Sequence, residues 1–192
     1  MFRMDEDQLN ALLAKNPTLS VSKHSITKRE NPPDGMQQHK ERDGQNKYRN
    51  YPVYVFSDGF VFDSSIERMS RKEISDTRKR LTNTHGPVTE CYDSKKEYRR
   101  CLELRLLEKS GMITGLKRQH VLVIQPATQY RDERLHAVTY CADFFYQENG
   151  VTVVEDVKGI DKPTGKPLTT QVFDLKWKLL KAKYPQYLFR IF

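Results

Sequence analysis

The chain has 192 residues, a formal net charge of +8 and 30% charged residues. This length suits one domain with extensions, since a domain core usually takes about 100 to 150 residues. The positive charge favours a polyanionic partner, and nucleic acid is favoured over a membrane because no apolar run in the sequence approaches the roughly 20 residues that span a bilayer.

The sequence also points to a reducing compartment. Its acidic start, MFRMDEDQ, is unlike a secretory signal, and its cysteines (Cys91, Cys101 and Cys141) are odd in number and lack Cys-x-x-Cys spacing. The histidines are scattered without the spacing of zinc ligands, which argues against a zinc finger. We therefore expect a cytoplasmic protein with no membrane partner.

The first 46 residues are predicted to form a helix and a flexible basic arm, ahead of a main domain at 47–192. Residues 5–16 carry acids in the first turn, an apolar stripe of Leu9, Leu12 and Leu13, and Pro17 directly after the end. This helix could pack on the core, which is the favoured role, or bind a protein partner. The polar stretch that follows resembles a linker, whose basic residues either contact DNA or are only solvated.

Two elements are expected between residues 51 and 91. Strand-like runs on either side of Ser57-Asp58-Gly59 predict a hairpin at 51–62. A helix is predicted over 64–81, in what looks like an insertion at about 64–91, and its Arg71 and Lys72 are candidate DNA contacts or a solvated face. Ser64 and Glu67 have the spacing of a capping box at the start of this helix.

The same capping spacing recurs at Ser94 and Glu97, which predicts a second helix over 94–109 with a broad apolar surface. The segment QHVLVIQP, at 119–126, predicts a buried strand that starts at Gln119 and ends at Pro126.

A hairpin around Asn149-Gly150 is predicted for residues 143–158, DFFYQENGVTVVEDVK. Alternation along its second strand places Asp156 and Lys158 on one face and Glu155 on the other, and the turn folds Asp143 back toward Asp156. Two converging carboxylates suit Mg²⁺ or Mn²⁺ and phosphodiester hydrolysis. The alternatives are a surface cross-strand pair, or a bulge that makes Glu155 the ligand.

The last predicted elements are a helix at 169–183 and a strand at 187–192. The helix is expected to place Val172, Leu175, Leu179 and Leu180 inward. Its outward lysines are candidate DNA contacts: Lys176, Lys178 and Lys181.

Asp143, followed by Asp156-Val157-Lys158, resembles the motif of the PD-(D/E)XK nuclease superfamily, although Ala142 stands where that motif has proline. The chain is also similar to a small phage family of that superfamily, in segments 92–113, Gln119, 140–146, 153–159 and 172–192. The resemblance implies a restriction-endonuclease-like αβββαβ core of the α/β class, with a central mixed sheet flanked by helices.

The resemblance also implies a site. Glu97, Asp143, Asp156 and the carbonyl of Val157 would hold Mg²⁺ or Mn²⁺, with Glu67 as the competitor of Glu97 for the helix position. Lys158 would lie beside the attacking water, and Gln119 would orient water or a phosphate.

These expectations combine into a phage-encoded, metal-dependent DNA endonuclease in the host cytoplasm. By analogy with other small phage nucleases, its substrate would be branched or recombination-intermediate DNA, as for a Holliday-junction resolvase, and it would act as a homodimer. The alternative is a non-catalytic nucleic-acid-binding protein that retains the nuclease fold.

Overall fold

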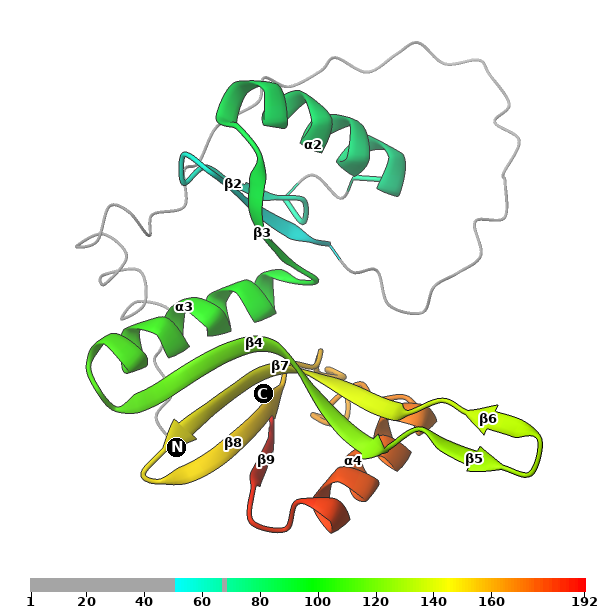
Figure 1. The fold of residues 1–192 in the computed structure, drawn as a ribbon. Coiled ribbons are helices and arrows are strands. Elements are labelled where there is room, and N and C mark those ends of the chain that lie inside the picture. The colour runs from blue at the N-terminus through cyan, green and yellow to red at the C-terminus, as the bar shows by residue number, and fades with distance from the viewer. Residues whose placement is uncertain (1–50, 67–68) are drawn as a thin grey trace. The chain divides into compact units, whose positions relative to one another are not determined.

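The computed structural model describes residues 51–66 and 69–192, which form an α/β protein (Figure 1). These residues fall into two compact units, one ending at Lys95 and the other running from Lys96 to Phe192. No helix in the described ranges is long and apolar enough to cross a membrane. The predicted helix at 5–16 and the arm that follows it lie outside the described residues, and the division into 1–46 and 47–192 stays a prediction.

The first unit is a three-stranded antiparallel sheet with one helix. Strands β1 (Val53–Phe56) and β2 (Val61–Asp63) form the predicted hairpin, which is confirmed. Strand β3 (Val88–Tyr92) pairs with β1 and gives the order β2-β1-β3, and helix α2 (Arg71–His85) precedes it. Strand β3 was not predicted, because its five residues contain one aliphatic side chain and lie in a segment taken as an insertion.

Helix α2 begins later than predicted, at Arg71 instead of 64. Its capping box is formed by Ser70 and Glu73: the Ser70 hydroxyl accepts from the Glu73 N–H at 3.3 Å, and the Glu73 carboxylate accepts from the Ser70 N–H at 2.8 Å. The predicted start is a turn, in which the Asp63 carboxylate accepts from the Ser65 N–H at 2.9 Å. Glu67 lies outside the described residues.

The second unit has the element order α-β-β-β-α-β around one mixed sheet. Its elements are α3 (Lys95–Lys109), β4 (Ile113–Gln125), β7 (Val138–Glu148), β8 (Val151–Asp156), α4 (Gln171–Lys183) and β9 (Leu188–Ile191). The strand order is β4-β7-β8-β9, and β9 runs parallel to β8 whereas the other pairs are antiparallel. A small hairpin of β5 (Thr128–Tyr130) and β6 (Glu133–Leu135), which was not predicted, lies between β4 and β7 (Figure 1).

The predicted hairpin of β7 and β8 is confirmed. Asn149 and Gly150 have φ values of 51° and 77°, as the type I′ turn requires, and Glu148 pairs with Val151 directly beside them. The pairing continues regularly to Phe144 and Glu155. Continued by one residue, the same register brings Asp143 and Asp156 to the end of the ladder.

Strand β4 differs from its prediction in extent and burial. It begins at Ile113, so Gln119 lies within the strand, with a positive φ of 50°, and not at its start. The strand is buried on one face only, since Leu122 is 5% exposed whereas Val121, on the opposite face, is 56% exposed.

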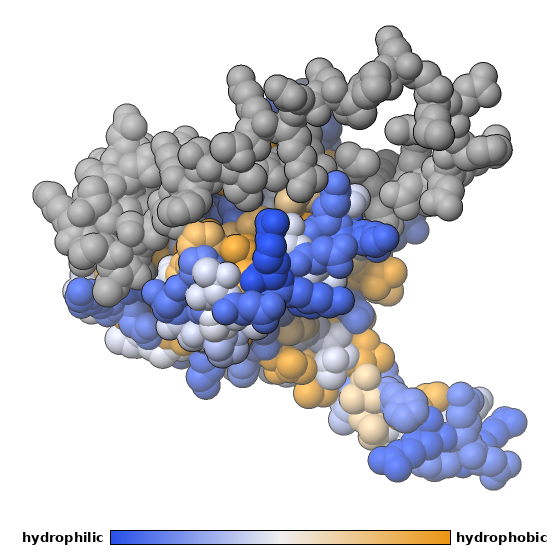
Figure 2. All heavy atoms as spheres, turned by 90° about the horizontal axis from the view of Figure 1, so that it is seen from above, coloured by the Kyte–Doolittle hydropathy of each residue, from blue (hydrophilic) through white to orange (hydrophobic). Residues whose placement is uncertain are grey.

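Helix α4 is rotated relative to its predicted orientation. Phe173, Trp177 and Leu180 pack in the core with Tyr140. Three of the four residues expected inward are exposed instead: Val172, Leu175 and Leu179. The two aromatic rings stack on each other at 5.2 Å and fill more core volume than the aliphatic stripe would. Apolar side chains lie among hydrophilic ones at the molecular surface, as Figure 2 shows for one face.

Candidate active site

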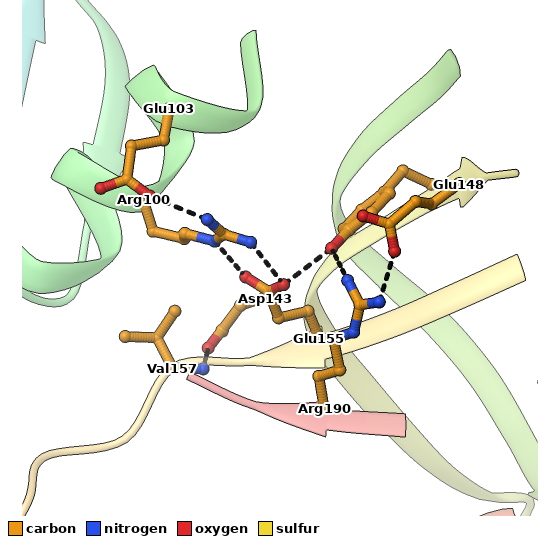
Figure 3. A network of polar contacts seen from close by, with 8 residues as sticks. Arg100, Glu103, Asp143, Glu148, Glu155, Val157 and Arg190 are labelled. Carbon is orange, nitrogen blue, oxygen red and sulfur yellow. Dashed lines mark hydrogen bonds and ion pairs between the residues drawn. The ribbon is translucent and has the colours of Figure 1, made fainter. Parts of the chain in front are cut away.

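Asp143 and Asp156 meet at the end of the β7–β8 ladder. Asp156 is the last residue of β8 and is 3% exposed. Asp143 is half-buried, and one of its carboxylate oxygens accepts the Val157 N–H at 2.8 Å (Figure 3). The main chain that follows Asp156 therefore fixes the position of the Asp143 side chain.

Glu97 and Gln119 complete this group of polar side chains. Glu97 lies in the first turn of α3 and is 3% exposed. The amide nitrogen of Gln119 lies 3.4 Å from a carboxylate oxygen of Glu97 and 3.4 Å from one of Asp143. The positive φ of Gln119 costs about 1 kcal/mol for a non-glycine residue, and such strain concentrates at functional sites.

Both carboxylate oxygens of Asp156 have a hydrogen-bond donor. The Lys158 ammonium contacts one oxygen, and the Tyr140 hydroxyl donates to the other. The same ammonium lies 4.7 Å from the ring centroid of Phe173, a residue of α4. Asp156 is therefore held in one orientation by groups from β7 and from the segment after β8.

Negative charge dominates the electrostatics of these residues. Burial, followed by the charges of Asp156 and Glu97, raises the pKa of Asp143 to about 7, against the opposing effects of the Val157 N–H and of Lys158. Burial, followed by the charges of Asp143, Asp156 and Glu97, also raises the pKa of the Cys141 thiol, which donates to the side-chain amide oxygen of Gln119 at 3.2 Å. A carboxyl group whose ionisation is opposed by neighbouring negative charges favours a bound cation.

The donor chemistry fits a hard divalent cation, because Glu97, Asp143 and Asp156 all offer carboxylate oxygens. Within the described ranges, however, no three His, Cys, Asp or Glu side chains are already arranged to hold a metal ion. Lys158 and the Gln119 amide occupy positions beside these oxygens. Ion binding would therefore require both side chains to shift away from the carboxylates.

Glu155 is not directed at this group, and its proposed role as an alternative ligand is wrong. It is fully buried and receives two hydrogen bonds from the Arg100 guanidinium, at 2.6 and 2.9 Å, and a third from the Tyr146 hydroxyl at 2.8 Å (Figure 3). Burial tends to lower the pKa of Arg100. The hydrogen bonds and negative charge of Glu155 and the hydrogen bond of Glu103 have a larger combined effect and raise this pKa above its ordinary value. The β7–β8 pairing has no bulge that would shift the register.

Sequence reasoning missed Tyr140, Cys141 and Arg100. The strand pattern identified Tyr140 and Cys141 only as residues that pack in the sheet. Their contacts with Asp156 and Gln119 are visible only in the three-dimensional structure. Arg100 lies on a helix surface that was correctly predicted as core, where an arginine would have suggested a buried acidic partner.

The predicted DNA-contacting residues lie on α4 and α2, one helix in each unit. The Lys176 ammonium donates to the Thr139 carbonyl at 2.9 Å, which ties α4 to β7, whereas Lys178 and Lys181 are exposed. Arg71 and Lys72 are exposed in the first turn of α2, in the other unit.

A family model described as "Protein of unknown function (DUF1064)" matches residues 88–190. The chain belongs to the DUF1064 family. Comparisons with curated proteins and with solved structures gave no match. The DUF1064 match contains the whole carboxylate group, from Glu97 to Lys158, whereas β1, β2 and α2 precede its first residue.

Proposed function

We propose that this DUF1064 protein is a divalent-metal-dependent DNA endonuclease that hydrolyses phosphodiester bonds. The observation that carries the proposal is the convergence of Glu97, Asp143 and Asp156, from one helix and two adjacent strands, with Lys158 in contact with Asp156. Burial and the neighbouring carboxylates raise the pKa of Asp143 to about 7, and a carboxyl group perturbed in this way is typical of catalytic sites.

The fold of the second unit supports the same proposal. Its order α3-β4-β7-β8-α4-β9, with β9 parallel to β8, agrees with the αβββαβ core that the resemblance to PD-(D/E)XK nucleases implies. In such a core the acidic residues come from the central hairpin, and here Asp143 and Asp156 lie on β7 and β8.

Each residue has a chemical role in this proposal. Glu97, Asp143, Asp156 and the Val157 carbonyl would hold Mg²⁺ or Mn²⁺, which when bound lowers the pKa of water and neutralises charge on the phosphate. Lys158 would leave Asp156 and orient the attacking water or stabilise the developing oxyanion. The Gln119 side chain would move away from the carboxylates of Glu97 and Asp143, and its amide would donate to water or to a phosphate oxygen.

Branched or recombination-intermediate DNA is the proposed substrate, with a homodimer as the active form. The net charge of +8 supports a nucleic-acid substrate, and the preference for branched DNA rests on the likeness to small phage nucleases.

Cleavage of a matched DNA panel tests the proposal. The panel holds a four-way junction, a flap, a nicked duplex, a linear duplex and a single strand, each with Mg²⁺, Mn²⁺ or EDTA. We expect metal-dependent cutting, preferentially of the branched substrates. Asp156→Ala should lower the rate by roughly 100-fold or more, since it removes one of the carboxylates proposed to hold the metal ion. Asp132→Ala, at an exposed position in the β5–β6 turn, is the matched control and should cut normally.

Undiminished cutting by Asp156→Ala, or equal cutting in EDTA, would contradict the assignment. Binding of DNA without cutting on every substrate would favour a non-catalytic nucleic-acid-binding protein. One observation favours that second function: both oxygens of Asp156 are already engaged, by Tyr140 and Lys158.

A further inference from the structure

The first unit contains a groove with no assigned role. It has a volume of about 480 Å³ and lies between α2 and the start of β3. Its lining residues are Arg78, Lys79, Thr82, Asn83, Pro87 and Val88. Two of the six are cationic and none is acidic, which favours an anionic ligand. All but Val88 precede the residues matched by the DUF1064 model, so the groove belongs mainly to the part of this chain that the family model does not match.

Arg78 is held in place although it is exposed. Its guanidinium carbon lies 5.5 Å from the ring centroid of Tyr54, which is 9% exposed. Burial is the largest effect on Tyr54 and raises the pKa of its hydroxyl, while the charge of Arg78 and a hydrogen bond from it oppose that rise. An arginine anchored in this way loses less conformational entropy when it binds a phosphate through its planar fork.

The wall opposite α2 is also fixed. The Ser57 N–H donates to the Pro87 carbonyl at 3.0 Å, and the Ser57 hydroxyl donates to the His85 carbonyl at 3.2 Å. Between these residues Gly86 has φ of 79°, and a Cβ at this position would lie 2.3 Å from the Ser57 hydroxyl oxygen. The His85 imidazole lies 2.7 Å from the Asp58 carboxylate. The groove is therefore preformed.

We propose that this groove binds the phosphodiester backbone of nucleic acid. Arg78 and Lys79 hold a phosphate, and the Asn83 amide donates to a further oxygen of the backbone. Thr82 plays a lesser part, because its hydroxyl already donates to the Arg78 carbonyl at 2.9 Å. Pro87 and Val88 provide an apolar surface for the sugar. Free phosphate or a mononucleotide shares this chemistry, whereas only a polymer can also occupy sites beyond the groove.

The test compares two cationic residues on one helix. Lys79 and Arg80 are both exposed residues of α2, but only Lys79 lines the groove. Each is changed to Glu in the full chain carrying Asp156→Ala, and binding to a labelled DNA duplex is measured by fluorescence anisotropy in EDTA at several salt concentrations. We expect Lys79→Glu to weaken binding about tenfold and to reduce the salt slope by about 1, as for the loss of one phosphate contact. Arg80→Glu should change affinity less than about twofold, with both melting temperatures unchanged.

Equal losses in the two variants would overturn the inference, because only general electrostatic attraction would then remain. An unchanged affinity of Lys79→Glu would also overturn it. A separate titration with thymidine monophosphate distinguishes a nucleic-acid polymer from a free nucleotide as the ligand. Thymidine monophosphate should bind more weakly than the duplex; if it binds as tightly, the groove is a site for free nucleotides instead. The EDTA and the Asp156→Ala background keep this test independent of cleavage, so the groove and the proposed nuclease can fail separately.

Discussion

Asp143 lowers the stability of the folded protein at neutral pH. An aspartate in an unfolded chain has a pKa of about 3.9, whereas burial and the neighbouring carboxylates raise the pKa of Asp143 in the folded protein to about 7. The folded state therefore binds this proton more tightly. The stability gained from this tighter proton binding is full below the pKa that Asp143 has in the unfolded chain, and it is lost as the pH rises from about 4 through 7.

Asp143→Asn is predicted to stabilise the protein in EDTA, and to do so more at pH 8 than at pH 5. The amide keeps an oxygen that can accept the Val157 N–H but carries no charge. The gain in the free energy of unfolding should be larger at pH 8 by roughly 1 to 3 kcal/mol. Urea unfolding followed by the fluorescence of Trp177, the only tryptophan, measures it.

Asp132→Asn, in the exposed β5–β6 turn, is the control for this experiment and should show no such pH dependence. An equal effect of Asp143→Asn at both pH values would mean that Asp143 titrates normally.

At the residue scale, sequence predicted the acidic pair but not its surroundings. Asp143 and Asp156 could be paired because the Asn-Gly turn fixes the register of the hairpin. The contact of Tyr140 with Asp156 spans sixteen positions and depends on how the strands twist, which no local pattern encodes.

At the scale of elements, helix α4 supports the site through Tyr140. The Tyr140 ring lies edge-on to Phe173 and to Trp177, with centroids 6.1 and 5.7 Å away, and its hydroxyl donates to Asp156. Burial and the charge of Asp156 raise the pKa of this hydroxyl, so it stays protonated and remains a donor. The packing of α4 on the sheet thus determines how Asp156 is presented.

Tyr140→Phe is predicted to weaken Mn²⁺ binding about tenfold or more, as the loss of a group that orients a metal ligand does. The ring and its contacts with α4 remain, so the melting temperature should change little. Calorimetric titration measures the affinity. Tyr184→Phe is the matched control. Tyr184 lies in the same unit, and its hydroxyl donates to the Val123 carbonyl at 2.9 Å, so this change also removes a hydrogen-bonded hydroxyl. If Tyr140→Phe binds Mn²⁺ as tightly as the wild type, the Tyr140 hydroxyl does not orient Asp156 for metal binding and this tyrosine contributes only to packing.

Element types were easier to predict from sequence than their faces and ends. The segment VFDLKWKLLKAK carries two apolar stripes, and only the fit of Phe173 and Trp177 against Tyr140 determines which of them is buried. The first part of β4 escaped prediction because ITGLKR has no apolar run, and it is paired with β7 nevertheless. Tertiary pairing overrode weak local propensity there.

At the scale of the whole molecule, the order of α3, β4, β7, β8, α4 and β9 was predictable, whereas β3, the β5–β6 hairpin and the division into units were not. Residues 96–192 hold 17 Lys and Arg against 11 Asp and Glu, and so carry most of the net charge of +8, but no linker-like segment marks a boundary at Lys95. That boundary falls at the start of α3, and the DUF1064 match extends across it. The carboxylate group lies within the second unit and the groove within the first, so the two proposed sites can be tested in the same full chain.

Titration of Mn²⁺ into the wild type and into Asp143→Ala, at pH 7 in two buffers of different ionisation enthalpy, tests the central claim most directly. The wild type should bind one ion through Glu97, Asp143 and Asp156. It should also release about half a proton, because the pKa of Asp143 lies at about 7. Asp143→Ala should lose both signals. Equal binding in the two proteins, or no binding in the wild type, would contradict a metal site at these carboxylates.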